Sequence, residues 1–254
     1  MNEPWKIKED DSREEDTLIT YIIFCEDKVS EPVYFKFFET SRIKINLIPN
    51  QKSSFDNVVR AISYCRKEGI VSEEEGEDWS LPEDFNVWCV FDRDKNIDEA
   101  QNVRSNIEFD EAIAHAKRRG IKVAWSNDAF ELWVLLHFEA VKVTDVSIVN
   151  RITYYNRLTE VFRNIDTPSE KLQKAISHQT FGYKSDLKRE KNFRSIVREK
   201  MIPLTSTAIN RAKELEDHFN SLQIASHQKS PLTLVHHLVE ELISLGGRIE
   251  INTN

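Results

Sequence analysis

Glycine is scarce in this 254-residue chain: it occurs six times, and nowhere in the spacing of a glycine-rich phosphate loop. A Walker A motif needs such glycines because its backbone amides wrap around the phosphates of a nucleotide. Hydrolysis of nucleoside triphosphates by this chain is therefore not expected. Ser126 is not embedded in a G-x-S-x-G motif either, so a serine nucleophile has little support.

Cysteine and long apolar runs are also scarce. The three cysteines, Cys25, Cys65 and Cys89, cannot all pair, and no C-x-x-C spacing indicates zinc. No segment approaches the roughly 20 uninterrupted apolar residues that a membrane helix needs. Residues 1–16 are mostly charged and lack the apolar core of a signal peptide. We therefore expect a protein of the reducing cytoplasm.

Positive charge is in deficit, with 35 Lys and Arg against 43 Asp and Glu and a formal net charge of -8. A protein that coats nucleic acid non-specifically is disfavoured, because its affinity would come from neutralised phosphates. A nuclease is not excluded, since metal ions can offset active-site acids and local basic patches can hold a backbone. The basic segment 183–200 is typical of an exposed helix laced with ion pairs.

Two aspartates follow an apolar run over residues 87–91 that is typical of a buried strand. Residues two apart on a strand point to the same side, so Asp92 and Asp94 are expected to project together from its carboxyl end. Open α/β sheets bind ligands at that edge, and paired carboxylates suit Mg²⁺ or Mn²⁺. The alternative is a solvated turn, in which aspartate is common.

A third acid, Glu26, directly follows another apolar run, residues 18–25. A short loop then leads into a helix near residues 30–39, with Ser30 as its expected N-cap. If the two strands are neighbours in one parallel sheet, Glu26 and the aspartate pair emerge at the same edge. Three acids converging there favour a divalent-metal site.

The first half of the chain alternates between strand and helix patterns, which predicts an α/β fold with a mainly parallel sheet flanked by helices. The second half predicts helices alone, with no strand past Phe138. We expect a charged tail over 1–16, an α/β domain over 17–140 and a helical extension over 141–254 packed on it; the last two can equally form one continuous domain. The expected strands are 18–25, 43–48, 87–91 and 121–125; the expected helices are 30–39, 56–67, 109–119, 146–163, 169–178, 188–200, 207–220 and 232–245.

Two further residues are candidates for the same site. Glu131 opens a helix that is apolar nearly all round; it either forms a capping box with Asp128 or serves as a metal ligand or general base. Lys184 stands beside Gly182 before a helix, where a lysine can meet a scissile phosphate as a point charge. His137 is expected to be a hydrogen-bonded core residue rather than a ligand.

Four blocks of sequence stand out along the chain: Phe24-Cys25-Glu26 with Ser30-Glu31-Pro32 and Tyr34-Phe35, Val90-Phe91-Asp92-Arg93-Asp94, Ser126-Asn127 with Phe130-Glu131-Leu132-Trp133-Val134-Leu135-Leu136-His137-Phe138, and Ser230-Pro231-Leu232-Thr233-Leu234-Val235 with Leu238-Val239-Glu240-Glu241-Leu242. In this order they resemble the RloB family, a Toprim-like group found in bacterial restriction-linked and abortive-infection loci. The likeness covers nearly all of the chain after residue 17. Asp27 departs from the pattern, because glycine is usual there, and this puts substrate approach near it in question.

The resemblance implies a Toprim fold in which Glu26, Asp92 and Asp94 hold Mg²⁺ (or Mn²⁺). By position, the further acid and the lysine of related Toprim nucleases fall on Glu131 and Lys184. The implied activity is metal-dependent cleavage of DNA or RNA, tRNA included, by the effector of an anti-phage system. Family members are expected to work beside a partner ATPase of the ABC or SMC-like kind.

Two other functions stay open. In the first, the chain is a non-catalytic subunit whose acidic cluster holds a structural cation and whose helical half docks on an ATPase or senses a phage product. In the second, it is a phosphotransfer or nucleotide-binding enzyme, because Toprim sites also handle nucleotides and nucleic-acid ends.

Overall fold

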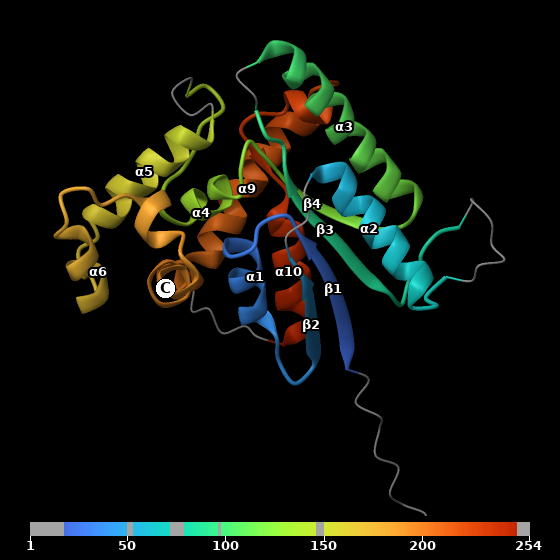
Figure 1. Cartoon of the computed structure of the whole chain (residues 1–254), viewed down its shortest axis with the longest axis horizontal. Helices are drawn as coiled ribbons and strands as arrows, with labels where there is room; N and C mark the ends of the chain where they lie inside the picture. The colour runs from blue at the N-terminus through green and yellow to red at the C-terminus, as the bar shows by residue number, and fades with distance from the viewer. Residues whose placement is uncertain (1–17, 50–52, 72–78, 96–97, 146–149, 248–254) are drawn as a thin grey trace, which may run out of the picture.

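The computed structural model describes residues 18–49, 53–71, 79–95, 98–145 and 150–247. Its centre is a five-stranded sheet in the order β2-β1-β3-β4-β5 (Figure 1). The first four strands are parallel and β5 is antiparallel to β4, which confirms the predicted mainly parallel sheet. The strands are β1 (Ile19–Cys25), β2 (Ile43–Ile48), β3 (Asn86–Asp92), β4 (Lys122–Asn127) and β5 (Leu232–Thr233).

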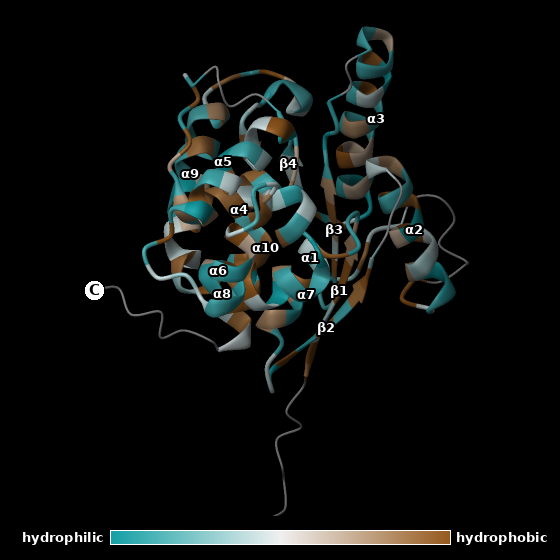
Figure 2. Ribbon diagram, turned by 60° about the vertical axis from the view of Figure 1, so that its left-hand side comes forward, coloured by the Kyte–Doolittle hydropathy of each residue, from teal (hydrophilic) through white to brown (hydrophobic). Residues whose placement is uncertain are grey.

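Helices cover both faces of the sheet (Figures 1 and 2). From β1 the chain first crosses to β2 on one side and then to β3 on the other. Because such parallel crossovers are right-handed, this reversal places α1 and α2 on opposite faces. One face carries α2 (Ser54–Lys67) and α3 (Glu99–Arg118); the other carries α1 (Ser30–Phe35), α4 (Glu131–Phe138), α9 (Thr205–Asn220) and α10 (Val235–Gly246).

The central strands read as continuous apolar runs because both of their faces are covered. The last five residues of β1 are all buried, as are Val87 to Phe91 of β3. Helix α4 is buried along its whole length except at Phe138, as its apolar sequence predicts. The free cysteines Cys25, Cys65 and Cys89 belong to this core.

The start of α3 and the N-cap of α1 differ from the prediction. Helix α3 begins at Glu99, ten residues before the expected Phe109, and the Asp98 carboxylate caps it by accepting the N–H of Gln101 at 2.9 Å. Its first turns are largely solvent-exposed and therefore show no apolar periodicity. Ser30 is the first residue of α1 and not its cap; the Asp27 carboxylate accepts its N–H at 3.0 Å.

The second half of the chain is helical but not purely so. The expectation of no strand past Phe138 is wrong, because β5 pairs with β4; two residues are too few to show an alternating pattern. The expected helix over 188–200 is a chain of short turns: α7 (Glu190–Asn192), a π-helical turn η4 (Phe193–Val197) and α8 (Arg198–Met201). Helices α5 (Arg151–Arg163) and α6 (Glu170–Ile176) precede them.

The C-terminal segment completes the core of the sheet. Helix α10 packs on β4 and β2, and α9 packs on α4 and β5. The expected tail over 1–16 lies outside the described residues. Within the described ranges, no helix combines the length and the apolar character needed to cross a membrane.

Candidate metal centre

The candidate site lies at the carboxyl ends of β1 and β3, where the chain order reverses. In open α/β sheets this switch point leaves a crevice that binds ligands. Cys25 pairs with Val90 across the two strands, and the N–H of Glu26 donates to the Val90 carbonyl at 3.1 Å. The backbone pairing therefore carries Glu26 to the end of β3.

Glu26 and Asp92 meet there, although 66 residues separate them. The N–H of Asp92 donates to Glu26 Oε2 at 3.0 Å. Asp92 is the last residue of β3, and its Oδ1 is buried without a hydrogen-bond donor among the described residues. The structure thus brings together two of the acids selected from the sequence.

Two glutamates at helix starts add to this pair. Glu31, in the first turn of α1, is fully buried, and its Oε2 accepts the N–H of Asp27 at 3.2 Å. Glu131 is the first residue of α4 and is also fully buried. The charges of Glu31, Glu26 and Glu131 all raise the pKa of Asp92, in that order after burial. Four carboxyl groups, at the ends of β1 and β3 and the starts of α1 and α4, are therefore near enough for the other three to act on Asp92.

Burial makes the charged form of these acids unfavourable. Burial raises the pKa of Glu26 to about 7, although the hydrogen bond from the Asp92 amide lowers it in part. Burial, followed by the charges of Asp27 and Glu26, also raises the pKa of Glu31 well above its ordinary range. Closely spaced buried carboxylates need a compensating cation or a proton.

The donor set fits a hard divalent cation. Three carboxylate oxygens, Asp92 Oδ1, Glu31 Oε1 and Glu131 Oε2, are buried without a hydrogen-bond donor among the described residues. Buried polar atoms are ordinarily satisfied, so orphaned oxygens on three acids that influence one another require an explanation. Oxygen donors of this kind suit Mg²⁺ or Mn²⁺.

Asp94 differs from this set in its contacts and exposure. Strand β3 ends at Asp92, so the alternation that would place Asp94 on the same side stops before it. Its side chain is 53% exposed and forms an ion pair with Arg151, whose Nη2 also lies 3.6 Å from Asp128 Oδ1. As a metal ligand, Asp94 would first have to leave Arg151, and that role stays a prediction.

A lysine not selected from the sequence contacts the cluster. Lys188 Nζ lies 2.8 Å from Glu131 Oε1 and 3.6 Å from Asp27 Oδ2. Burial opposes its charge, but Glu131 and Asp27 outweigh burial and hold the pKa of Lys188 above its ordinary range. Lys184 is exposed one turn away, with its Nζ 5.5 Å from the Tyr155 ring centroid. Lys188 packs over the same ring at 5.8 Å.

All of these residues fall within a match to the family described as RloB-like protein, which spans residues 21–242. The chain belongs to the RloB-like protein family. No curated protein and no solved structure matches it. The resemblance seen in the sequence is thereby confirmed for most of the chain.

In this RloB-like protein the capping box expected as the alternative role of Glu131 is not formed. The N-cap of α4 is Phe130, and Asp128 instead accepts the N–H groups of Lys95 at 2.6 Å and Arg151 at 2.9 Å. The Glu131 carboxylate is thus left to the cluster. The core role expected of His137 is confirmed: the ring is buried, and its Nδ1–H donates to the Trp133 carbonyl at 2.9 Å.

Sequence reasoning missed Glu31 and Lys188 in this RloB-like protein for different reasons. Glu31 occupies the first turn of a helix, where an acid is favoured by the helix dipole and attracts no notice. Its signal was the distance of only five residues from Glu26, at the same sheet edge. Lys188 lies within a run of alternating charges, a pattern that ordinarily predicts an exposed helix. No local pattern singles it out.

Proposed function

We propose that this chain is a metal-dependent nuclease that hydrolyses phosphodiester bonds with Mg²⁺ or Mn²⁺. The observation that carries the proposal is a set of four acids at the switch point, Glu31 and Glu131 fully buried and Glu26 and Asp92 half-buried. The charges of the other three raise the pKa of Asp92, and three of the four keep an oxygen without a hydrogen-bond donor among the described residues. Glu26, Asp92 and Glu31 would hold the cation. A divalent ion there supplies an acidified water and stabilises charge developing on the phosphate.

The other side chains have roles that follow from their contacts. Glu131 is oriented by Lys188 and serves as a further ligand or as the base that accepts a proton from the attacking water. Lys188 keeps its charge beside Glu131 and so presents a fixed cation to the scissile phosphate. Lys184, exposed beside it, meets the substrate backbone. Asp94 joins the ligands when Arg151 pairs with a substrate phosphate instead.

The biological setting we propose is the effector of a bacterial anti-phage, abortive-infection system, acting on DNA or RNA. Membership of the RloB-like family supports it. The net charge of -8 supports a protein that does not bind nucleic acid indiscriminately. A partner ATPase of the ABC or SMC-like kind would restrain or deliver the nuclease.

The proposal is tested by incubating purified protein with plasmid, single-stranded DNA and total RNA, in Mg²⁺, Mn²⁺ or chelator. Substituting a residue that only supports a metal ligand typically lowers metal affinity or activity about 10–100-fold. Glu26→Gln and Asp92→Asn, which change proposed ligands themselves, should each lose at least as much activity. Glu160→Gln, an exposed acid on α5, is the matched control and should retain activity. Cleavage that survives in the first two variants would identify a contaminant or another site.

One observation favours the non-catalytic subunit as a second candidate. The cluster already contains a cation of the protein itself, because Lys188 pairs with Glu131. A structural role would then need a metal only for stability. Mg²⁺ that raises the melting temperature, without cleavage of any substrate by the wild type alone or with its partner ATPase, would establish this alternative.

A further inference from the structure

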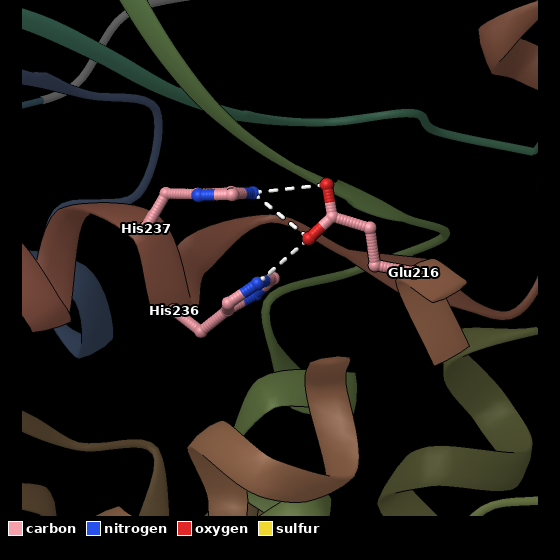
Figure 3. A group of neighbouring side chains, drawn as sticks. All are labelled: Glu216, His236 and His237. Atoms are coloured by element: carbon pink, nitrogen blue, oxygen red, sulfur yellow. Dashed lines mark hydrogen bonds and ion pairs between the residues drawn. The ribbon is translucent and has the colours of Figure 1, made fainter. Parts of the chain in front are cut away.

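A second cluster of metal-ligating side chains joins α9 to α10 (Figure 3). It consists of Glu216 on α9 and of His236 and His237 in the first turn of α10. His236 Nε2 lies 2.9 Å from Glu216 Oε2, and His237 Nε2 lies 3.0 Å from Oε1. One ligand atom of each residue lies within 4.8 Å of the other two.

Adjacent residues of a helix ordinarily point about 100° apart and do not share a target. Here the two imidazole rings lie 4.2 Å apart between centroids, and both Nε2 atoms face the same carboxylate (Figure 3). Packing holds the His236 ring, because this side chain is fully buried. Its other nitrogen, Nδ1, has no hydrogen-bond partner among the described residues. The ring of His236 is therefore oriented through Nε2 alone.

We propose that Glu216, His236 and His237 bind a Zn²⁺ ion, with solvent as the fourth ligand. Two imidazoles and one carboxylate are a donor set that zinc takes in tetrahedral sites with one open position. Nitrogen donors favour Zn²⁺ over Mg²⁺, in contrast to the oxygen-only cluster at the sheet edge. The proposal does not depend on the proposed nuclease activity.

The surroundings suit an ion that enters from solvent. The His237 side chain is 47% exposed, whereas His236 anchors the site from inside. The two Nε2 atoms and the Glu216 carboxylate already lie within 4.8 Å of one another. Each Nε2 would have to move away from the carboxylate oxygen by only about a few tenths of an ångström, from hydrogen-bond distance to the spacing of two ligands on one zinc ion. The ion would fasten α9 to α10, and both helices pack against the sheet core.

The test uses the full chain, stripped of metal by a chelator and then titrated with Zn²⁺ in an excess of Mg²⁺. We expect one tightly bound Zn²⁺ per chain, measured by atomic emission after gel filtration, and a higher melting temperature with zinc. His237→Ala and Glu216→Gln should each weaken zinc binding at least tenfold. His218→Ala is the matched control, because His218 is exposed on α9 against Phe219 and outside the cluster.

A double variant, Glu26→Gln with Asp92→Asn, separates this site from the carboxylate cluster and should keep the zinc. Cobalt substituted for zinc should give the intense visible absorption of a four-coordinate site in the wild type and not in His237→Ala. Circular dichroism checks that each variant is folded. Failure of the wild type to retain zinc, equal binding by His237→Ala, or loss of zinc only in the double variant would each overturn the proposal.

Discussion

The Glu26 carboxyl group combines burial with a position beside three other acids, and its pKa rises to about 7 from an ordinary 4.5. The metal-free folded protein therefore holds a proton that the unfolded chain releases between those two values. Stability consequently falls as pH rises through this window. Asp92 and Glu31 shift in the same direction for the same reason.

In the presence of chelator, we expect Glu26→Gln to have nearly the melting temperature of the wild type at about pH 5. At about pH 8 its melting temperature should be the higher of the two, because the amide never acquires the buried charge. Mg²⁺ should reverse the order at the higher pH, since only the wild type offers a deprotonated ligand. Thermal melts across the pH range measure both effects. A difference between the two proteins that does not change with pH would contradict the prediction.

Lys188 and Lys184 provide a matched pair of lysines one turn apart. Lys188→Met leaves Glu131 buried without its cation, so we expect a loss of stability of roughly 1–3 kcal/mol, reduced because Lys188 is partly exposed. Cleavage should fall on the order of 10²-fold. Lys184→Met should change stability by less than about 0.5 kcal/mol.

Urea unfolding and single-turnover cleavage separate these contributions. An equal loss of cleavage in Lys184→Met, without loss of stability, would return the phosphate-binding role to Lys184, where the sequence pattern places it. Stability that is unchanged in Lys188→Met would instead show that the ion pair with Glu131 adds nothing to the fold.

The sequence predicts the part of the site that strand geometry controls. Glu26 and Asp92 each end an apolar strand, and parallel pairing alone brings such residues to one edge. Asp94 lies past the end of β3, where its position depends on Arg151, a tertiary contact that no alternation reveals. Lys188 likewise reaches the cluster through the packing of distant turns, so its selection required coordinates.

At the scale of elements, strands and helices with long apolar patterns are predicted well, and short or polar ones are not. The four parallel strands agree with their apolar runs to within two residues or so. The first ten residues of α3 are missed because exposure removes their periodicity. Strand β5 is missed because a two-residue strand exists only through its partner β4.

The β4–β5 pairing is fastened by one buried hydrogen bond between side chains, Ser126 Oγ to Thr233 Oγ1 at 2.9 Å. Ser126→Ala leaves the Thr233 hydroxyl short of a partner, and we expect a loss of about 1–2 kcal/mol. The double variant, Ser126→Ala with Thr233→Val, lacks both hydroxyls and should lose less stability than the sum of the two single variants. Urea unfolding of the four proteins measures this cycle; additive losses would show that the two groups do not interact.

At the scale of the whole molecule, the two halves of the chain share one core. Helix α4 belongs to the first half, yet it packs against α5 and α9 of the second. Helix α10 places Leu238, Val239 and Leu242, all fully buried, beneath the sheet. The sequence shows the apolar faces of these helices but not what covers them.

A boundary near residue 140 can be tested directly by expressing residues 17–140 alone. We expect this fragment not to fold cooperatively, because it would expose the apolar surface of α4 and one face of the sheet, far more than the few hundred Å² that a soluble monomer ordinarily tolerates. It would also lack Lys188, so the buried charge of Glu131 would be unpaired. Circular dichroism melts and limited proteolysis, compared with the full chain, measure the outcome. A sharp thermal transition in the fragment would establish an independent α/β domain and make the helical half an appendage to it.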